Sequence, residues 1–175
     1  VPGWEGNMWV KWIRRLEFGD KPYMTREETS KYTDLLTDGK ARMFTWVMEA
    51  KSVVTSPSPE KPILHQGIQQ LRGLAWSGKG KIKRVDVSLD GGKNWRTAQL
   101  HAPIMSKSLV RFTLPFEWSG EELLIQSRAI DETGYVQPYI QELQKIRGKN
   151  SIYHNNSIAT WLVSKSGKVD NVRLG

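Results

Sequence analysis

The chain has 175 residues, 26 basic against 18 acidic, and a formal net charge of +8. This length suits one well-packed domain with or without an appendage, and apolar runs of only a few residues exclude a membrane-spanning helix. The chain has no cysteine, and His65, His101 and His154 lie too far apart for a metal-binding motif. Its basic residues are scattered apart from those within 79–84, which favours a solvated surface over a nucleic-acid interface.

The first 43 residues are expected to be the end of an upstream domain. They begin VPGWEGNMWVKWI, which reads as the interior of a longer polypeptide, and they are too short to form a core of their own. Residues 8–16 alternate weakly, as in a strand. Thr25 followed by Glu28 is typical of a capping box, so either a short helix to about Leu36 or a loop follows.

From residue 44 onward, short strand-like runs predict an all-β domain that extends to residue 175. The first run, 44–54, ends at SPSPEKP (56–62), whose prolines predict an extended linker. The later runs are 69–76, 81–89, 94–100, 109–114, 123–129 and 158–163. Their spacing is typical of an antiparallel, immunoglobulin-like β-sandwich. Its expected core includes Trp76, Val85, Val87, Trp95 and Leu114.

Two local patterns refine this fold. Ile82 and Val85 cannot face the same side of a straight strand, so burial of both requires a bulge or strong twist near Lys83. The surrounding KGKIKR is expected to be a solvated edge, where lysines oppose pairing with another sheet. Residues 138–148, PYIQELQKIRG, place Ile140, Leu143 and Ile146 at helical spacing before a glycine, which predicts one helix.

The acidic, glycine-rich centre of VDVSLDGGKNW (85–95) could be a metal loop, a phosphate loop or a bend. A calcium loop needs alternating oxygen ligands and a closing Glu, and Asp90 is followed by Gly91 and Gly92 instead. A phosphate loop needs a longer glycine spacing before a helix, whereas both flanks here resemble strands. Asp-Gly between two such runs predicts a hairpin.

Three segments together resemble the sulfite-oxidase family of molybdenum enzymes. GLAWSGKGKIKRVDVSLDGGKNW and AIDETGYVQP (129–138) resemble the C-terminal dimerisation domain of that family, and VPGWEGNMWVKW resembles the element that ends its cofactor domain. This resemblance implies a homodimer and a molybdenum-molybdopterin cofactor bound mostly by an upstream domain, whose cysteine supplies the metal's thiolate ligand. It implies no catalytic residue and no metal ligand in this chain. It also implies cofactor contacts at Trp9, Val10 and Lys11, of which Lys11 offers a cation to the cofactor phosphate; an ordinary strand lysine is the alternative.

Within the family, VPGWEGNMWVKW, TREETSKYTDL and SIYHNN look closest to the molybdenum subunit of the sulfane dehydrogenase type. Leu35, Leu36 and Thr37 stand where sulfite oxidases have an Asp-Tyr pair, and residues 158–160 (Ile-Ala-Thr) stand where they end in Trp-His-Arg. The resemblance implies a periplasmic enzyme that oxidises a protein-bound cysteine persulfide and passes electrons to a cytochrome c partner.

Two alternatives remain open. Eight tryptophans also suit a stand-alone β-sandwich that binds glycans or peptides. His154, Asn155 and Asn156 either form a capped turn or reach a pocket or a partner subunit.

Overall fold

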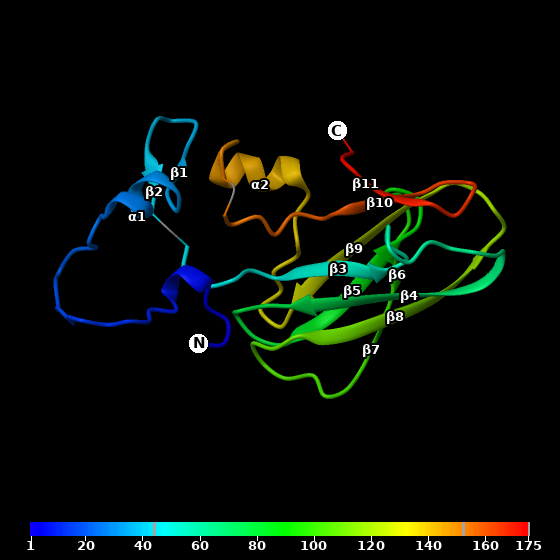
Figure 1. Cartoon of the computed structure of the whole chain (residues 1–175), viewed down its shortest axis with the longest axis horizontal. Helices are drawn as coiled ribbons and strands as arrows, with labels where there is room; N and C mark the ends of the chain where they lie inside the picture. Colours follow the sequence, from blue (N-terminus) through cyan, green and yellow to red (C-terminus); the bar gives the residue numbers. More distant parts are fainter. Residues whose placement is uncertain (44, 152, 175) are drawn as a thin grey trace.

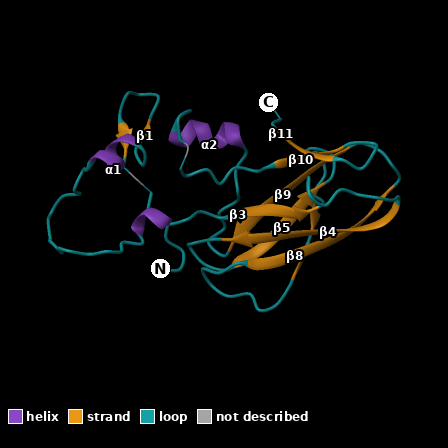
Figure 2. Ribbon diagram, in the orientation of Figure 1, coloured by secondary structure: helices purple, strands orange, loops and turns teal. Residues whose placement is uncertain are grey.

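The structure, a computed structural model, describes residues 1–43, 45–151 and 153–174. Figures 1 and 2 show a β-sandwich with an N-terminal region of largely irregular structure at one end. The N-terminal region contains η1 (Gly6–Met8), α1 (Arg26–Ser30), β1 (Asp34–Leu35) and β2 (Ala41–Arg42). The rest of the chain contains β3 (Lys51–Ser56), β4 (Gly67–Trp76), β5 (Ile82–Ser88), β6 (Arg96–Thr97), β7 (Gln99–Leu100), β8 (Val110–Trp118), β9 (Leu123–Asp131), α2 (Ile140–Arg147), β10 (Thr160–Val163) and β11 (Val169–Val172).

The sandwich has the strand order of an immunoglobulin domain. One sheet runs β3-β4-β8-β7 and the other β11-β10-β9-β5-β6, with antiparallel pairing between neighbouring strands. In chain order these are the ABED and C′CFG sheets of that fold, with β11 added at one edge. The predicted fold class is therefore confirmed. Sequence analysis did not identify β11 or the small β1–β2 hairpin.

The core lies between the two sheets and follows the alternation of each strand. Along β8, buried residues alternate with exposed or half-buried ones. The buried ones are Val110, Phe112, Leu114, Phe116 and Trp118. Val85 and Val87 are also buried, as predicted, whereas Trp76 and Trp95 are only half-buried. The Trp95 ring instead supports Arg128, whose guanidinium carbon lies 4.1 Å from the ring centroid.

The predicted irregularity at Lys83 is confirmed. Ile82 pairs with Asp131 and Arg84 with Ile130, so the register shifts by one residue at Lys83. This bulge lets both Ile82 and Val85 face the core. Lys81, Lys83 and Arg84 are exposed, because β6 pairs only with the later part of β5.

The loop between β5 and β6 is a hairpin, as predicted. Gly91 and Gly92 adopt positive φ, and Asp90 Oδ1 accepts hydrogen bonds from the backbone of Lys93 and Asn94 at 3.1 and 2.9 Å. These bonds and the Ser88 hydroxyl hold the pKa of Asp90 well below its usual range. The carboxylate thus serves the turn, and the metal and phosphate interpretations are not needed.

Several predicted elements were wrong in extent or type. Residues 94–100 are two short strands, β6 and β7, because the chain passes from one sheet to the other at buried Ala98. Ser56 ends β3, and residues 57–62 lie in a loop between two strands of one sheet, closed by reciprocal hydrogen bonds between Ser58 and Lys61, not in an extended linker. The run at 44–54 becomes a strand only from Lys51, and its first residue, Phe44, lies outside the described residues.

The N-terminal predictions were also partly wrong. Residues 9–16 form no strand, and η1 occupies 6–8. The helix after Thr25 ends at Ser30, and the Thr25 side chain makes no capping hydrogen bond. The chain then turns into β1, because tertiary contacts at Asp34 outweigh the weak helical pattern.

Candidate functional site at the junction

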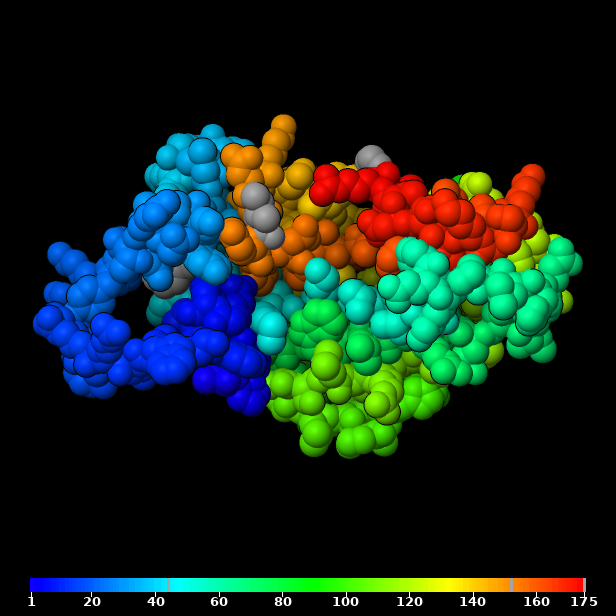
Figure 3. All heavy atoms as spheres, viewed as in Figure 1, coloured from blue at the N-terminus to red at the C-terminus, as the bar shows by residue number. Residues whose placement is uncertain are grey.

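The N-terminal region is joined to the sandwich by a short backbone ladder, here called the junction. Trp4 and Val47 form an antiparallel bridge, and the Glu5 amide donates to the Trp46 carbonyl at 2.8 Å. The Met48 amide donates to the Gly3 carbonyl at 2.9 Å, and the Gly78 amide to the Met48 carbonyl at 2.8 Å. Gly3 is a glycine for two reasons: its φ is +83°, and a Cβ there would lie 2.8 Å from the Gly78 carbonyl oxygen. Figure 3 shows the first residues, in dark blue, lying directly against the sandwich.

Glu49, just before β3, is the centre of a charged network at the junction. Its Oε2 atom accepts from Tyr135 Oη at 3.0 Å, from His154 Nε2 at 3.2 Å and from Arg147 Nη2 at 3.5 Å. Its Oε1 atom lies 3.5 Å from Lys79 Nζ. Burial raises the pKa of Glu49, but these partners outweigh burial and lower it to about 2. Glu49 is therefore an anion throughout the physiological range.

Arg147 connects Glu49 to Asp34 of the β1–β2 hairpin. Its side chain is 1% exposed, and its Nη1 atom donates to Asp34 Oδ2 at 3.2 Å and to Thr45 Oγ1 at 2.6 Å. The predicted helix α2 is confirmed, and it ends before Gly148 at φ +79°. Its buried face consists of Leu143 and Arg147, while Ile146 is exposed. An arginine can occupy this face because two carboxylates balance its charge.

His154 links the loop after α2 to Glu5 near the N-terminus and to Glu49 before β3. Its Nδ1 atom forms a short hydrogen bond with the Glu5 carboxylate, and its Nε2 atom reaches Glu49. The ring is 8% exposed. Burial lowers the pKa of His154, yet the hydrogen bonds with Glu49 and Glu5 exceed that effect and raise it. We call Glu5, Asp34, Glu49, Tyr135, Arg147 and His154 the junction network.

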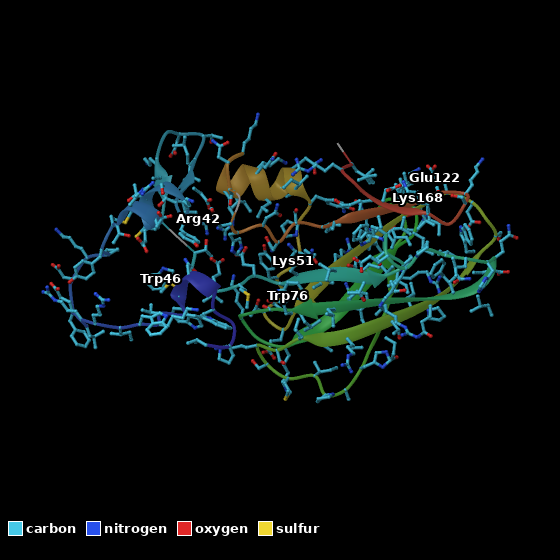
Figure 4. All side chains as sticks on the ribbon, in the orientation of Figure 1. Arg42, Trp46, Lys51, Trp76, Glu122 and Lys168 are labelled. Atoms are coloured by element: carbon cyan, nitrogen blue, oxygen red, sulfur yellow. The ribbon has the colours of Figure 1, made fainter. Side chains whose placement is uncertain are left out.

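A cleft of about 420 Å³ opens beside this network. It is lined by His154, Asn155 and Asn156, together with residues of η1 and with Lys51 and Trp76 of the sandwich. Figure 4 shows Lys51 and Trp76 at the end of the sandwich that faces the N-terminal region. The three loop residues thus lie at a cavity. Asn155 also forms a capped turn, because its Oδ1 atom accepts from the Ser157 amide and hydroxyl at 3.1 and 2.7 Å. Ile152 of the same SIYHNN segment lies outside the described residues.

A second cavity, of about 550 Å³, adjoins the first, and Lys51, Tyr153 and Asn155 line both. Ile158, Ala159 and Thr160 line it, and the buried Gln126 amide donates to Thr160 Oγ1 at 2.8 Å. The cationic side chains in its lining are Lys51 and Arg173. Lys51 Nζ donates to the Asn155 carbonyl, and burial lowers the pKa of Lys51. Leu35 lies elsewhere, exposed on the β1–β2 hairpin.

Trp9, Val10 and Lys11 do not line the cleft. They begin a segment, residues 9–24, in which every residue is exposed. Figure 1 shows this segment, in blue, looping away from the sandwich towards α1. Trp9 is 53% and Val10 71% exposed, and the Trp9 indole donates back to the Trp4 carbonyl at 3.1 Å. Trp12 is 91% exposed and holds φ +59°, a strained conformation for a bulky residue.

The tryptophans of the sandwich do not form an open binding face. Trp118 is buried, and Trp76, Trp95 and Trp161 are half-buried. The Trp161 indole donates to the Val54 carbonyl at 3.2 Å. The basic run at 79–84 is likewise partly neutralised, by Lys79 with Glu49 and by Arg84 with Asp86 at 3.0 Å. These positions give little support to glycan or nucleic-acid binding.

Among its described residues, this chain has no group that fits a metal site. It has no cysteine, and within the described ranges no three His, Asp or Glu residues lie close enough together to hold a metal ion. Lys11 and the residues around it are exposed. Among the described helices, none is long and apolar enough to cross a membrane.

Sequence analysis singled out His154, Asn155 and Asn156 and did not name Glu5, Asp34, Glu49 or Arg147. Each of these pairs with a partner at least 98 positions away. The one available signal was Arg147, which follows Leu143 by four residues and so shares its helix face.

The chain thus combines an immunoglobulin-like sandwich with an N-terminal region that a backbone ladder and a charged network hold at one end of it. The family described as the Mo-co oxidoreductase dimerisation domain matches residues 42–161, and the chain belongs to it. Its relatives include sulfite oxidase from Gallus gallus, 34% identical over 152 residues, and NADH nitrate reductase 2 from Nicotiana tabacum, 31% identical over 170 residues. Each of these alignments covers 79% of this chain but only 33% and 18% of the relative.

A solved structure agrees more closely. The crystal structure of the sulfane dehydrogenase SoxCD from Paracoccus pantotrophus contains a chain that is 61% identical, with a TM-score of 0.93. The match covers 100% of this chain and 45% of that one. The sulfane dehydrogenase type within the sulfite-oxidase family, expected from the sequence, is thereby supported, and the family is one that uses a molybdenum cofactor.

Proposed function

We propose that this chain is the dimerisation part of a molybdenum-cofactor enzyme that oxidises sulfane sulfur carried as a cysteine persulfide on a partner protein. Electrons pass from molybdenum to a cytochrome c partner, and the enzyme works in the periplasm. Residues 1–43 belong to the cofactor domain and residues 44–175 to the dimerisation domain. The observation that carries this proposal is the 61% identity with a sulfane dehydrogenase over the whole chain, including residues 1–41, which precede the family match.

The exposed segment supports the assignment of residues 1–43. Apolar side chains that are more than half exposed recur along it, and contiguous exposed apolar surface marks a contact with another structure. They are Trp9, Val10, Trp12, Ile13, Leu16 and Phe18. In this proposal they pack within the cofactor domain, and Lys11 contacts the cofactor phosphate.

The chain's own contribution is structural. It holds the segment that reaches the cofactor, forms the rim of the pocket with the 153–160 loop, and joins two subunits. The cofactor, when bound by the upstream domain, supplies the two-electron redox chemistry. Fold alone does not choose the substrate, because sulfite oxidase and nitrate reductase share this domain.

The test is a substrate comparison with the intact enzyme and cytochrome c reduction as the readout. A persulfidated carrier protein should give a kcat/KM at least about tenfold above that for free sulfite, a difference of about 1.4 kcal/mol in transition-state binding. A higher kcat/KM for sulfite would refute the substrate assignment. Sedimentation of the 175-residue chain should give twice its 20.0 kDa mass; a monomer at micromolar concentration would refute its role as a dimerisation unit.

A further inference from the structure

One imidazole joins three segments that are far apart in the sequence. The segments are the N-terminus at Glu5, the residues before β3 at Glu49, and the loop after α2 at His154. Both ring nitrogens of His154 face carboxylate oxygens. An ionised carboxylate only accepts hydrogen bonds, so both nitrogens must donate, and a histidine with two N–H groups is an imidazolium. A neutral ring would leave one nitrogen lone pair directed at a carboxylate.

We propose that His154 is a proton-dependent latch that holds the N-terminal region on the sandwich. The imidazolium bridges Glu5 and Glu49. Loss of its proton weakens the pairing of residues 3–5 with 46–48 and so loosens residues 3–8 from the sandwich. The latch is a property of this chain's own contacts and does not depend on the proposed reaction. Where that proposal also holds, the latch positions Trp9, Val10 and Lys11, which follow residue 8.

The charges around His154 favour the protonated ring. Three carboxylates belong to the ion pairs of the junction, Glu5, Asp34 and Glu49, against two other cations, Arg147 of α2 and Lys79 of the β4–β5 loop. The imidazolium therefore makes this group neutral, and its deprotonation leaves one excess negative charge in a partly buried place. The other titratable groups lining the adjoining cavities are Lys31, Tyr32, Lys51 and Tyr153. Of these, Lys51 donates to the Asn155 carbonyl. Tyr135, a further titratable group of the network, donates to Glu49.

The sign of the pH dependence follows from these contacts. The pKa of His154 is raised above the ordinary 6.5, so the latch is fully closed below about that pH and loosens as pH rises through the folded-state pKa. Because the pKa of Glu49 is lowered to about 2, its carboxylate stays charged over the whole of this range. The opening constant is the ratio of open to closed latch. At pH values between the pKa of His154 in the open state and its pKa in the closed state, this constant rises about tenfold per pH unit.

Hydrogen exchange can follow the latch directly. The amides of Glu5 and Met48 are protected only while residues 3–5 pair with 46–48, whereas those of β4 and β8 report on the sandwich. We would measure the intact protein by mass spectrometry between pH 5.5 and 9, with peptides covering 1–9 and 45–50, after correction for intrinsic exchange. Exchange of the His154 ring C2 hydrogen in the same samples gives the pKa of that ring, with exposed His65 as internal reference.

We expect the protection of the Glu5 and Met48 amides against exchange to fall at least about threefold between pH 6 and pH 8.5 in the wild type. The protection of the β4 and β8 amides should not change. His154→Gln should remove the pH dependence, and the control His65→Gln should retain it. Glu5→Gln should lower the ring pKa, and this variant tests the latch even if His154→Gln folds poorly. Protection of the Glu5 and Met48 amides that does not change with pH, a pH dependence that persists in His154→Gln, or a His154 ring pKa at or below the ordinary 6.5 would each overturn the proposal.

Discussion

Replacing Arg147 by Met tests how strongly the junction network holds the N-terminal region to the sandwich. Methionine keeps most of the side-chain volume but removes the charge that Asp34 and Glu49 share. Breaking a buried ion pair by removing one partner costs about 3–5 kcal/mol, because the remaining charge stays buried and unpaired. Asp34 and Glu49 are 11% and 16% exposed, and Glu49 keeps His154 and Tyr135 as partners, so the low end applies. We expect a loss of about 3 kcal/mol, or about two powers of ten in the folding equilibrium.

The assay is urea unfolding at pH 6, followed by far-ultraviolet circular dichroism. With a slope of about 1–3 kcal/mol/M, this loss lowers the midpoint by about 1–3 M. The matched control is Lys168→Met, which breaks the 3.0 Å ion pair between Lys168, just before β11, and Asp170 of β11. That pair is shorter than either ion pair of Arg147 but largely exposed, so its loss costs about 0–1 kcal/mol. Equal shifts in the two variants, or less than about 1 kcal/mol for Arg147→Met, would refute the reasoning.

Three further predictions address the same region. Lys11→Ala in the intact enzyme should lower molybdenum content while changing stability by no more than about 0.5 kcal/mol, because Lys11 is exposed; wild-type metal content and turnover would make it an ordinary surface lysine. Gly78→Ala should lower the free energy of unfolding by about 1–3 kcal/mol and expose the Met48 amide to hydrogen exchange, because a Cβ there would meet the carbonyl oxygens of Met48, at 2.7 Å, and of Gly3. Unchanged protection of the Met48 amide would contradict this. Glu49→Gln should flatten the loss of stability on acidification, because the contribution of Glu49 is present above its ordinary pKa of 4.5 and is lost as pH falls towards about 2; acid unfolding curves that coincide with wild type would argue against it.

The sandwich could be predicted from sequence because its signals are local. Burial of both Ile82 and Val85 requires the irregularity at Lys83, and Asp90 followed by two glycines between strand-like runs favours the hairpin. The division of residues 94–100 between two sheets could not be predicted in this way. β6 pairs with β5 in one sheet and β7 pairs with β8 in the other, and no residue pattern within 94–100 marks the change of sheet at Ala98.

The junction network could not be predicted because none of its contacts is local. The helix α2 shows why: Ile140, Leu143 and Ile146 predict an apolar face, but the buried residues are Leu143 and Arg147, while Ile140 is half-buried and Ile146 is exposed. The sequence of residues 140–147 does not indicate that two carboxylates, 98 and 113 positions away, balance the charge of Arg147. The SIYHNN loop was recognisable as unusual, but the two partners of His154 were not.

The chemistry of the junction suits a part that must be held in one position. A purely apolar contact tolerates sliding, whereas the ion pairs here are satisfied only when Glu5, Asp34 and His154 all lie in register with Glu49 and Arg147. A buried charge network adds little net stability, because desolvation offsets most of its attraction. It does impose a penalty on every other arrangement, since any displacement leaves a carboxylate or the guanidinium unpaired away from water. The network therefore fixes the direction in which the exposed segment leaves the sandwich, and through His154 it makes that direction sensitive to pH.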